Sequence, residues 1–267
     1  MSLSHLENHR KEIYLCSRCG YCREMVRARD GTHLICPVRE HTGGFDAYTA
    51  KGRLSIARAL LEHRVEITDG LLDITYSCTL CGNCTEHCLM VNPEAWHAFP
   101  EIKRQDHLID PAAVTEALRA DIFNAGLVPS KHRIMLEWCK EHHNPYMEKH
   151  KDRLRWIPKE RELPSEGEVA YFAGCTMPYR EAHLCRAAVK IMEDAEVNVS
   201  IVPDEWCCGS IFLRVGATDF ARKLAEHNIS AIETTGAKTV VTHCSGCFRT
   251  LKLDYPKLIG ELPFEVV

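Results

Sequence analysis

The sequence has no apolar run near the roughly 18–20 residues that a membrane-spanning helix needs. Its N-terminus, from Met1 to Arg10, is polar and has no apolar core of a signal peptide. Basic residues are not in excess either, since 33 Lys and Arg stand against 37 Asp and Glu, for a formal charge of −4. We therefore expect a cytoplasmic protein with no transmembrane segment of its own and no nucleic acid as a partner.

Two cofactor signatures are also missing. The sequence has no G-x-G-x-x-G of a flavin or nicotinamide site and no C-x-x-C-H of a haem site. Cysteine, in contrast, is abundant, with 15 among 267 residues. In a reducing compartment, closely spaced cysteines are typical of metal binding and not of disulfides.

Eight cysteines in the N-terminal part of the chain form two similar groups. They are Cys16, Cys19, Cys22 and Cys36, and then Cys78, Cys81, Cys84 and Cys88. Each group contains C-x2-C-x2-C, which places three thiolates on one tight turn. In two-cluster ferredoxins the fourth ligand of each [4Fe–4S] cluster comes from the other motif. The spacing thus predicts one cluster on Cys16, Cys19, Cys22 and Cys88, and a second on Cys78, Cys81, Cys84 and Cys36.

Neighbouring residues and an alternative metal bear on this prediction. Gly20 and Gly82 follow the second cysteine of each motif, where a residue without Cβ lets the backbone wrap a cluster. Thirteen residues separate Cys22 from Cys36, and Pro37 restores the Cys-Pro signature of bacterial ferredoxins. Two four-cysteine zinc sites are the alternative. A third cysteine at the same spacing in both motifs is superfluous for zinc, so we favour iron–sulfur clusters.

The segments between the cysteine groups are predicted to be helical. Leu54, Ala57 and Leu61 lie on one apolar face, which looks like the packing helix of an all-helical ferredoxin domain. Three nearby cations could offset the negative charge of a cluster, although we favour a solvated basic face; they are Lys51, Arg53 and Arg58. Further helices are expected from Pro111 to Gly126 and from Ser130 to Asn144. The charged stretch 149–168 is interpreted as a linker.

The C-terminal part alternates between strand and helix patterns, which predicts a parallel sheet covered by helices. Strands are expected at 169–173, 197–202 and 239–242, and helices at 180–195, at 218–235 and from Ser245. Five cysteines follow the three strands: Cys175, Cys207, Cys208, Cys244 and Cys247. Because loops after parallel strands meet at one edge of a sheet, these thiols are predicted to converge. Cys139 and Cys185 are predicted to be small core residues.

The pattern Cys-x31-Cys-Cys-Gly-x34-Cys-x2-Cys resembles the CCG motif of the heterodisulfide reductase B/D family. Because a two-cluster ferredoxin module precedes this motif, nearly the whole chain is similar to the D subunit of that family. Related iron–sulfur subunits serve glycolate oxidase, anaerobic glycerol-3-phosphate dehydrogenase and lactate-utilisation systems. The resemblance implies a further [4Fe–4S] cluster on all five cysteines, non-cubane in the family, and a plain four-ligand cubane is the alternative. Disulfide-reducing members carry two CCG motifs and this sequence shows one, so a split form and a relay both stay open.

These observations predict an α plus α/β fold. An all-helical two-cluster ferredoxin domain over 1–110 leads through a helical connector and linker over 111–165 to an α/β CCG domain with a small parallel sheet over 166–267. The predicted function is an electron-transfer subunit of a heterodisulfide reductase-like complex, cytosolic or membrane-associated, with a flavoprotein or second CCG subunit as partner. The alternatives are catalytic disulfide reduction at the CCG cluster and a zinc-stabilised interaction module. Catalytic residues and the direction of electron flow are not predicted.

Overall fold

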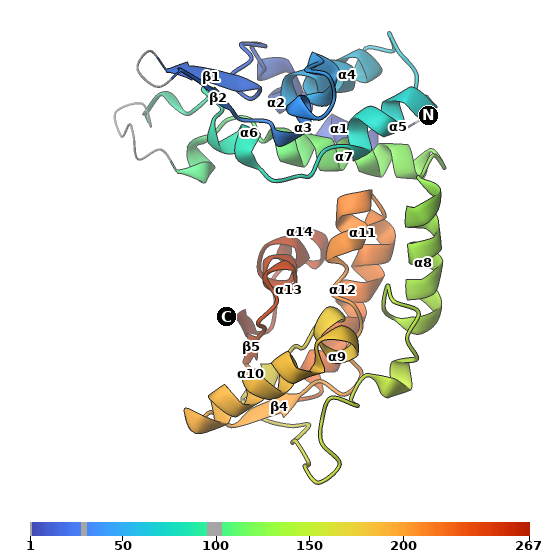
Figure 1. The fold of residues 1–267 in the computed structure, drawn as a ribbon, viewed down its shortest axis with the longest axis vertical. Coiled ribbons are helices and arrows are strands. Elements are labelled where there is room, and N and C mark those ends of the chain that lie inside the picture. The colour runs from blue at the N-terminus through green and yellow to red at the C-terminus, as the bar shows by residue number, and fades with distance from the viewer. Residues whose placement is uncertain (1, 28–30, 95–102) are drawn as a thin grey trace. The chain divides into compact units, whose positions relative to one another are not determined.

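The structure, a computed structural model, describes residues 2–27, 31–94 and 103–267 (Figure 1). The chain divides into two compact units. The N-terminal unit comprises Met1–Pro129 with Arg214–Ala217, and the C-terminal unit comprises Ser130–Leu213 with Thr218–Val267. Each unit has a hydrophobic core of its own.

Helices make up most of the N-terminal unit. They are α1 (Ser4–Asn8), α2 (Arg10–Leu15), α3 (Pro37–Glu40), α4 (Ala50–Leu61), α5 (Asp69–Tyr76), α6 (Asn83–Glu86) and α7 (Pro111–Asn124), with 3₁₀ turns η1 (Asp46–Tyr48) and η3 (Arg104–Asp106). The central element is α7, which packs against α1, α4, α5 and α6. Its Leu118 and Ile122 are fully buried in the core of this unit.

Local sequence explains where α7 begins and ends. The Asp110 carboxylate accepts hydrogen bonds from the backbone N–H groups of Ala112 and Ala113, and Pro111 occupies the first turn. Gly126, with φ +80°, follows the last turn, as predicted. The buried Asp121 carboxylate also accepts from the N–H groups of His5 and Leu6, which anchors the start of α1.

The N-terminal unit is not all-helical, so that part of the predicted fold class is wrong. An antiparallel hairpin of β1 (Glu24–Arg27) and β2 (Gly31–Leu34) fills the insertion between Cys22 and Cys36. The N–H groups of Ile35 and Cys36 both donate to the Arg23 carbonyl, which closes the base of the hairpin. β1 and β2 therefore pair with each other, and Cys36 is held beside Arg23 at the base of the hairpin.

The C-terminal unit contains the predicted parallel sheet, in the order β4-β3-β5-β6. Its strands are β3 (Val169–Tyr171), β4 (Val199–Ile201), β5 (Thr239–Val241) and β6 (Glu265–Val266), of which β6 was not predicted. In register, Val169 pairs with Val199 on one side and with Thr239 on the other. The helices are α8 (Ser130–His142), α9 (Thr176–Arg180), α10 (Ala182–Asp194), α11 (Ser210–Val215), α12 (Thr218–Glu233), α13 (Ser245–Arg249) and α14 (Tyr255–Ile259), with the π-turn η5 (Thr250–Asp254).

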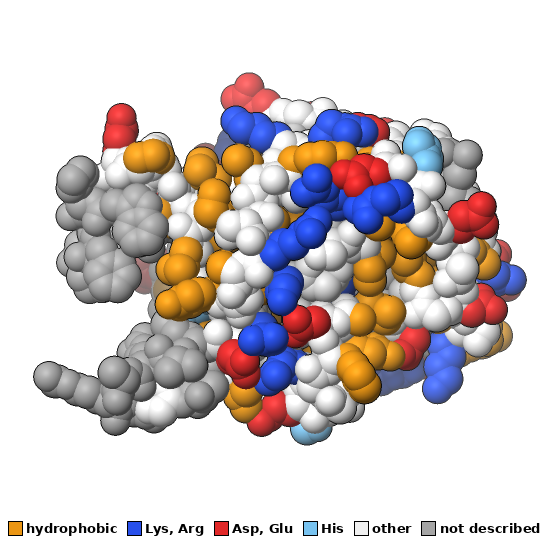
Figure 2. Space-filling view, turned by 90° about the horizontal axis from the view of Figure 1, so that it is seen from above, with side chains coloured by type: hydrophobic (Ala, Val, Ile, Leu, Met, Phe, Trp, Pro, Cys, Tyr) orange, Lys and Arg blue, Asp and Glu red, His pale blue; other side chains and the backbone are white. Residues whose placement is uncertain are grey.

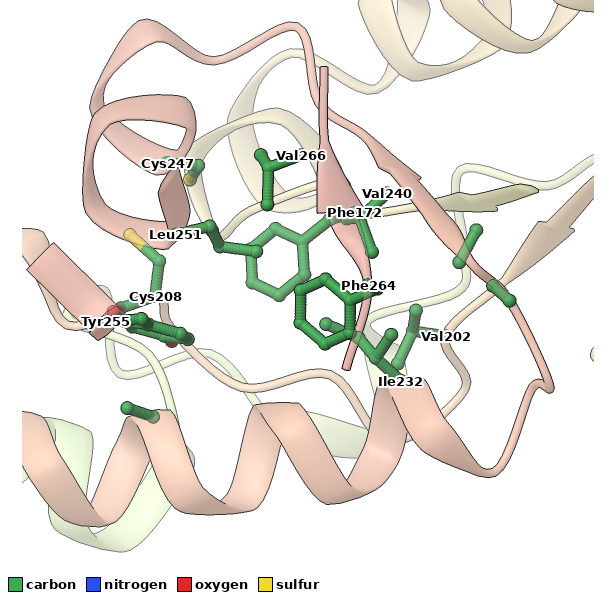
Figure 3. Packing of buried hydrophobic residues seen from close by; sticks show 13 residues of the cluster. Phe172, Val202, Cys208, Ile232, Val240, Cys247, Leu251, Tyr255, Phe264 and Val266 are labelled. Atoms are coloured by element: carbon green, nitrogen blue, oxygen red, sulfur yellow. The ribbon is translucent and has the colours of Figure 1, made fainter. Parts of the chain in front are cut away.

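Alternate residues of β3 and of the two residues after it enter two different hydrophobic clusters, because successive side chains of an extended chain point to opposite faces. Ala170 and Phe172 belong to one cluster, and Tyr171 and Ala173 to the other. In Figure 3, Cys208 and Cys247 lie at one end of the first cluster, while Ile232 lies toward the other end. The hydrophobic core therefore extends directly to the cysteines.

The stretch interpreted as a linker lies within the C-terminal unit. It contains the 3₁₀ turn η4 (His150–Asp152) and two buried residues, Arg153 and Trp156. The indole of Trp156 packs edge-on against the ring of Tyr171, with 5.9 Å between ring centroids. This segment therefore covers one face of the sheet.

Charged side chains of both signs share the molecular surface. Figure 2 shows Lys and Arg side chains running across one face with Asp and Glu among them. Several exposed cations are paired, such as Arg10 with Glu7 and Arg64 with Glu62. This mixture agrees with the small formal charge of −4.

Candidate metal centres

Two pockets in the N-terminal unit are each lined by four cysteines. The first pocket is lined by Cys16, Cys19, Cys22 and Cys88. The second pocket is lined by Cys36, Cys78, Cys81 and Cys84. Each has about 370 Å³ of empty volume. Each combines three cysteines of one motif with the fourth of the other, which is the crossed arrangement that the spacing predicts.

Cys36 lines the second pocket and lies at the base of the hairpin, where its N–H group donates to the Arg23 carbonyl. It stands just before α3, and its thiol lies 3.8 Å from the Tyr48 carbonyl. The Asn83 side-chain amide donates to the Ile35 carbonyl at 2.7 Å. This hydrogen bond connects the segment that carries Cys36 to the loop that carries Cys81 and Cys84.

The two cysteine loops share one backbone conformation. Gly20 and Gly82 both have positive φ, +88° and +78°, as expected for a backbone that turns tightly around a cluster. Arg18 and Leu80, each directly before the second cysteine, also have positive φ, at 59° and 52°. Residue type alone did not indicate this strain, because side chains at these positions normally avoid the left-handed region.

The chemistry of the donor sets fits bound iron–sulfur clusters. Burial raises the pKa of the Cys22 thiol to about 12, and the nearby Cys16 and Cys19 contribute in the same direction. Burial likewise raises the pKa of Cys84 to about 12. Within the described ranges no group of His, Cys, Asp or Glu side chains converges to hold a single ion; the four sulfurs surround a pocket instead. Thiols in this setting ionise when metal cations bind them.

Five cysteines form the third site, at the edge of the sheet where β3, β4 and β5 end. Cys175 and Cys244 stand at the starts of α9 and α13. The thiol of Cys207 lies 3.8 Å from that of Cys175 and also against that of Cys208. The thiol of Cys247 continues the series, with Cys208 on one side and Cys244 on the other. The fold thus brings these five thiols together at one edge of the sheet.

Close backbone approach shapes the third site. A Cβ on Gly174 would lie 2.9 Å from the Cys247 sulfur, and Gly174 has a φ of +75°. Hydrogen bonds from the Cys247 thiol and from the N–H groups of Cys247 and Gly246 lower the pKa of Cys244 to about 6. The loop before Cys175 and the turn of α13 therefore fit together with no room for a side chain between them.

Two protein families match separate parts of the chain. Residues 12–90 match the 4Fe-4S dicluster domain, and residues 169–252 match the cysteine-rich (CCG) domain. The D subunit of dihydromethanophenazine:CoB–CoM heterodisulfide reductase from Methanosarcina acetivorans is 34% identical over 268 residues, and that from Methanosarcina mazei is 31% identical over 276 residues. This chain is homologous to the D subunit of heterodisulfide reductase. All of its cysteines except Cys139 thus lie within a 4Fe-4S dicluster domain or a CCG domain.

The alignments with these two relatives cover 96% of the chain but 61% of each relative, so the chain spans about three fifths of their length. The B subunit of fumarate reductase (CoM/CoB) from Methanothermobacter marburgensis is 29% identical over 194 residues, 72% of this chain and 35% of that protein. All three relatives are named as subunits of reductases. No solved structure matches significantly. The helices of the described residues include none long and apolar enough to span a membrane.

A buried ion pair holds the loops of the CCG domain together. The Glu205 carboxylate accepts hydrogen bonds from the N–H groups of Ala173 (2.9 Å) and Gly174 (2.7 Å). Arg153 pairs with Glu205 and also donates to the Gly174 carbonyl. Burial raises the pKa of Glu205 to about 7, while Arg153 and the two N–H donors favour its ionised form. This clamp joins the loop before Cys175 to the loop before Cys207.

The clamp was missed by sequence reasoning because its two members are far apart in the chain. Arg153 lies in the stretch interpreted as a linker, and nothing in its neighbourhood marks it as buried. Glu205 stands two residues before Cys207, which is the one local signal that could have drawn attention to it.

A sixth cysteine of the C-terminal unit also contacts the third site. Cys139 is fully buried, as predicted, but its thiol lies against that of Cys207. Backbone hydrogen bonds link the two regions, from Cys207 N–H to the His143 carbonyl and from His143 N–H to the Cys139 carbonyl. Cys185, in contrast, is fully buried beside Tyr171, as expected of a core residue.

Proposed function

We propose that this chain is the iron–sulfur electron-transfer subunit of a multi-subunit oxidoreductase similar to heterodisulfide reductase. It holds two [4Fe–4S] clusters in the N-terminal unit and one further [4Fe–4S] cluster at the third site, and transfers electrons to or from a partner subunit. The observation that carries the proposal is the pair of pockets, each lined by four cysteines drawn from both ferredoxin motifs.

Thirteen cysteines are assigned as ligands. The first cluster takes Cys16, Cys19, Cys22 and Cys88, the second takes Cys36, Cys78, Cys81 and Cys84, and the third takes Cys175, Cys207, Cys208, Cys244 and Cys247. When bound, the clusters supply one-electron oxidation and reduction. The chain's own residues hold the thiolates in place and exclude water from most of each pocket.

Exposure supports a role in electron exchange with other proteins. Cys19 of the first pocket and Cys81 of the second are exposed, whereas the other cysteines of both pockets are partly buried. A cluster bound in either pocket would therefore have one ligand at the surface, where an electron donor or acceptor could approach it closely.

The third site supports a cluster with five thiolate ligands. Cys207 and Cys208 are both buried, and each contacts a further cysteine as well as its neighbour. Neither member of the pair points away from the group. This arrangement favours participation of both over a four-ligand cubane with one idle thiol.

The proposal is tested by metal analysis and low-temperature EPR of protein purified without oxygen. We expect roughly 12 irons per chain, the total for three four-iron clusters. Cys36→Ala should abolish one ferredoxin signal and leave the other, whereas Cys185→Ala should leave every signal unchanged. Zinc in place of iron, or far fewer irons than this total, would contradict the proposal.

Catalytic disulfide reduction at the third site is the second candidate, completed by a partner with another CCG motif. It is favoured by the names of the two Methanosarcina relatives, which describe a CoB–CoM heterodisulfide reductase. The reduced chain is incubated with candidate disulfides, alone and together with its partner subunits. Formation of free thiol supports catalysis, and its absence even in the full complex leaves the chain as an electron relay.

A further inference from the structure

Two buried arginines lie beside the second pocket. Arg53, on α4, is 2% exposed and lines that pocket together with its four cysteines. Its guanidinium donates to the Ile74 carbonyl at 2.9 Å and to the Ser77 hydroxyl at 3.0 Å. The interpretation of this residue as part of a solvated basic face is therefore wrong, because Arg53 is buried against the end of α5, directly before Cys78.

Arg119, on α7, also bonds to the end of α5 and to Cys78. It is 5% exposed, and its guanidinium donates to the carbonyls of Thr75 (3.1 Å) and Cys78 (2.5 Å). It also lies over the ring of Tyr76, 5.0 Å from the centroid. A ligand-bearing residue of the second cluster is thus directly hydrogen-bonded to a buried cation.

These two charges have no carboxylate partner among the residues that the structure describes. Within the described part of the chain, Arg53 and Arg119 donate hydrogen bonds to carbonyl and hydroxyl oxygens and to no carboxylate. The Glu116 carboxylate raises the pKa of Arg119 slightly by its charge, but it forms its ion pair with Arg214. Buried charges are normally paired, so these two require a nearby anion. A cluster bound by four thiolates is anionic and lies in the right place.

The first pocket differs, because no buried cation lines it within the described part of the chain. The two cations that line it are Arg18, which is exposed, and Lys51, which pairs with Asp46 at 2.8 Å. The negative charge of Asp110 helps to raise the pKa of the Cys84 thiol in the second pocket. That carboxylate already accepts hydrogen bonds from two backbone N–H groups at the start of α7. The second pocket therefore has the more positive surroundings.

We propose that Arg53 and Arg119 raise the reduction potential of the second cluster above that of the first, so that an electron in the N-terminal unit comes to rest on the second cluster. Net charge around a cluster and hydrogen bonding near its sulfurs are among the factors that set its potential. A buried cation favours the reduced cluster because that state carries one more negative charge. This inference rests on the proposed function and adds a direction of electron flow to it.

The experiment is an anaerobic redox titration of the full chain, followed by EPR. The signal that Cys36→Ala removes identifies the second cluster. In the unsubstituted chain we expect that signal to appear at the higher potential. Arg53→Gln and Arg119→Gln should each lower its midpoint by about 59 mV, which is a tenfold change for a one-electron couple.

Charge-conserving and surface variants separate charge from structure. Arg53→Lys and Arg119→Lys lose the forked hydrogen bonds but keep the charge, so the midpoint should stay near its original value. Arg58→Gln, at a half-exposed residue paired with Glu62, should change neither midpoint. A purely structural role predicts instead that Lys and Gln variants behave alike.

The outcomes separate the inference about the two potentials from the proposed function. If Lys and Gln variants shift the midpoint equally, or if the second cluster reduces at or below the potential of the first, the inference is overturned. Should the Gln variants fail to assemble clusters, the order of the two midpoints in the unsubstituted chain decides. Absence of iron–sulfur signals from the unsubstituted chain would instead overturn the proposed function.

Discussion

The two units gather their cysteines over very different distances along the chain. In the N-terminal unit, three cysteines of each pocket lie within seven residues of one another, on loops of the same conformation. In the C-terminal unit, the five cysteines come from three strand ends spread over 73 residues, from Cys175 to Cys247. The first kind of centre depends on local backbone geometry, and the second depends on the assembled sheet.

The buried arginines differ in the same way. Arg53 and Arg119 donate to carbonyls beside the second pocket. Because these acceptors are neutral, the positive charges can act on a cluster bound there. Arg153 is neutralised by Glu205, and that pair instead holds two loops together. Similar residues therefore serve a charge role in one unit and a positioning role in the other.

The largest effect is expected from Glu205→Ala. This change leaves Arg153 buried without its partner and removes the acceptor of the Ala173 and Gly174 N–H groups. Breaking a buried ion pair by removing one partner costs about 3–5 kcal/mol. Denaturant unfolding should show a loss of this size, and the third-site EPR signal should disappear while both ferredoxin signals persist.

Glu233→Ala serves as the control for this change, because Glu233 is exposed near the end of α12. It should alter stability by less than about 0.5 kcal/mol. An equal effect of the two substitutions would show that the clamp contributes nothing beyond an ordinary surface charge.

Next in size is Gly174→Ala, which places a Cβ 2.9 Å from the Cys247 sulfur at a residue with φ +75°. We expect the third cluster to be lost, with iron falling by about a third if three equal clusters are present. Gly236→Ala is the matched control, because Gly236 has a φ of +73° with nothing near its Cβ position. Both carry the left-handed strain of about 1–2 kcal/mol, so only steric contact separates them.

A smaller effect is predicted for Asn83→Ala, which removes the hydrogen bond to the Ile35 carbonyl. The loss is about 1 kcal/mol and is confined to the segment that carries Cys36. The second cluster should be lost to oxygen faster, as followed by visible absorbance, while the first and third clusters decay as before. Asn8→Ala, at an exposed residue of the same unit, provides the comparison, and equal decay in both variants would refute the prediction.

The smallest effect is expected from Cys139→Ala compared with Cys185→Ala. Both remove a fully buried thiol of the C-terminal unit, so their costs in packing are similar. Of these two cysteines, Cys139 lies against Cys207 and Cys185 does not, so the Cys139 substitution alone should change the EPR signal of the third site. Identical spectra for the two variants would place Cys139 back among ordinary core residues.

The spacing of the cysteines in the sequence was enough to predict much of the arrangement of the candidate metal sites. Three cysteines at a three-residue interval lie on one turn, and the Cys-Pro signature at Cys36 indicated a fourth candidate ligand across an insertion. The order of strands and helices after Val169 also predicted where the five C-terminal thiols meet, because parallel strands end at one edge. The hairpin was missed, since its two strands of four residues each have no strong strand pattern of their own.

Residue type and spacing were enough to predict which cysteines line the two N-terminal pockets and which five meet in the C-terminal unit. Which cations are buried became visible only in the folded chain. Arg53, Arg119 and Arg153 look like any other arginine in the sequence, and their exposure depends on helices and loops packing over them from distant positions. Charge near a cluster sets its potential and burial sets the strength of that charge, so this part of the function arises from the packing of distant segments.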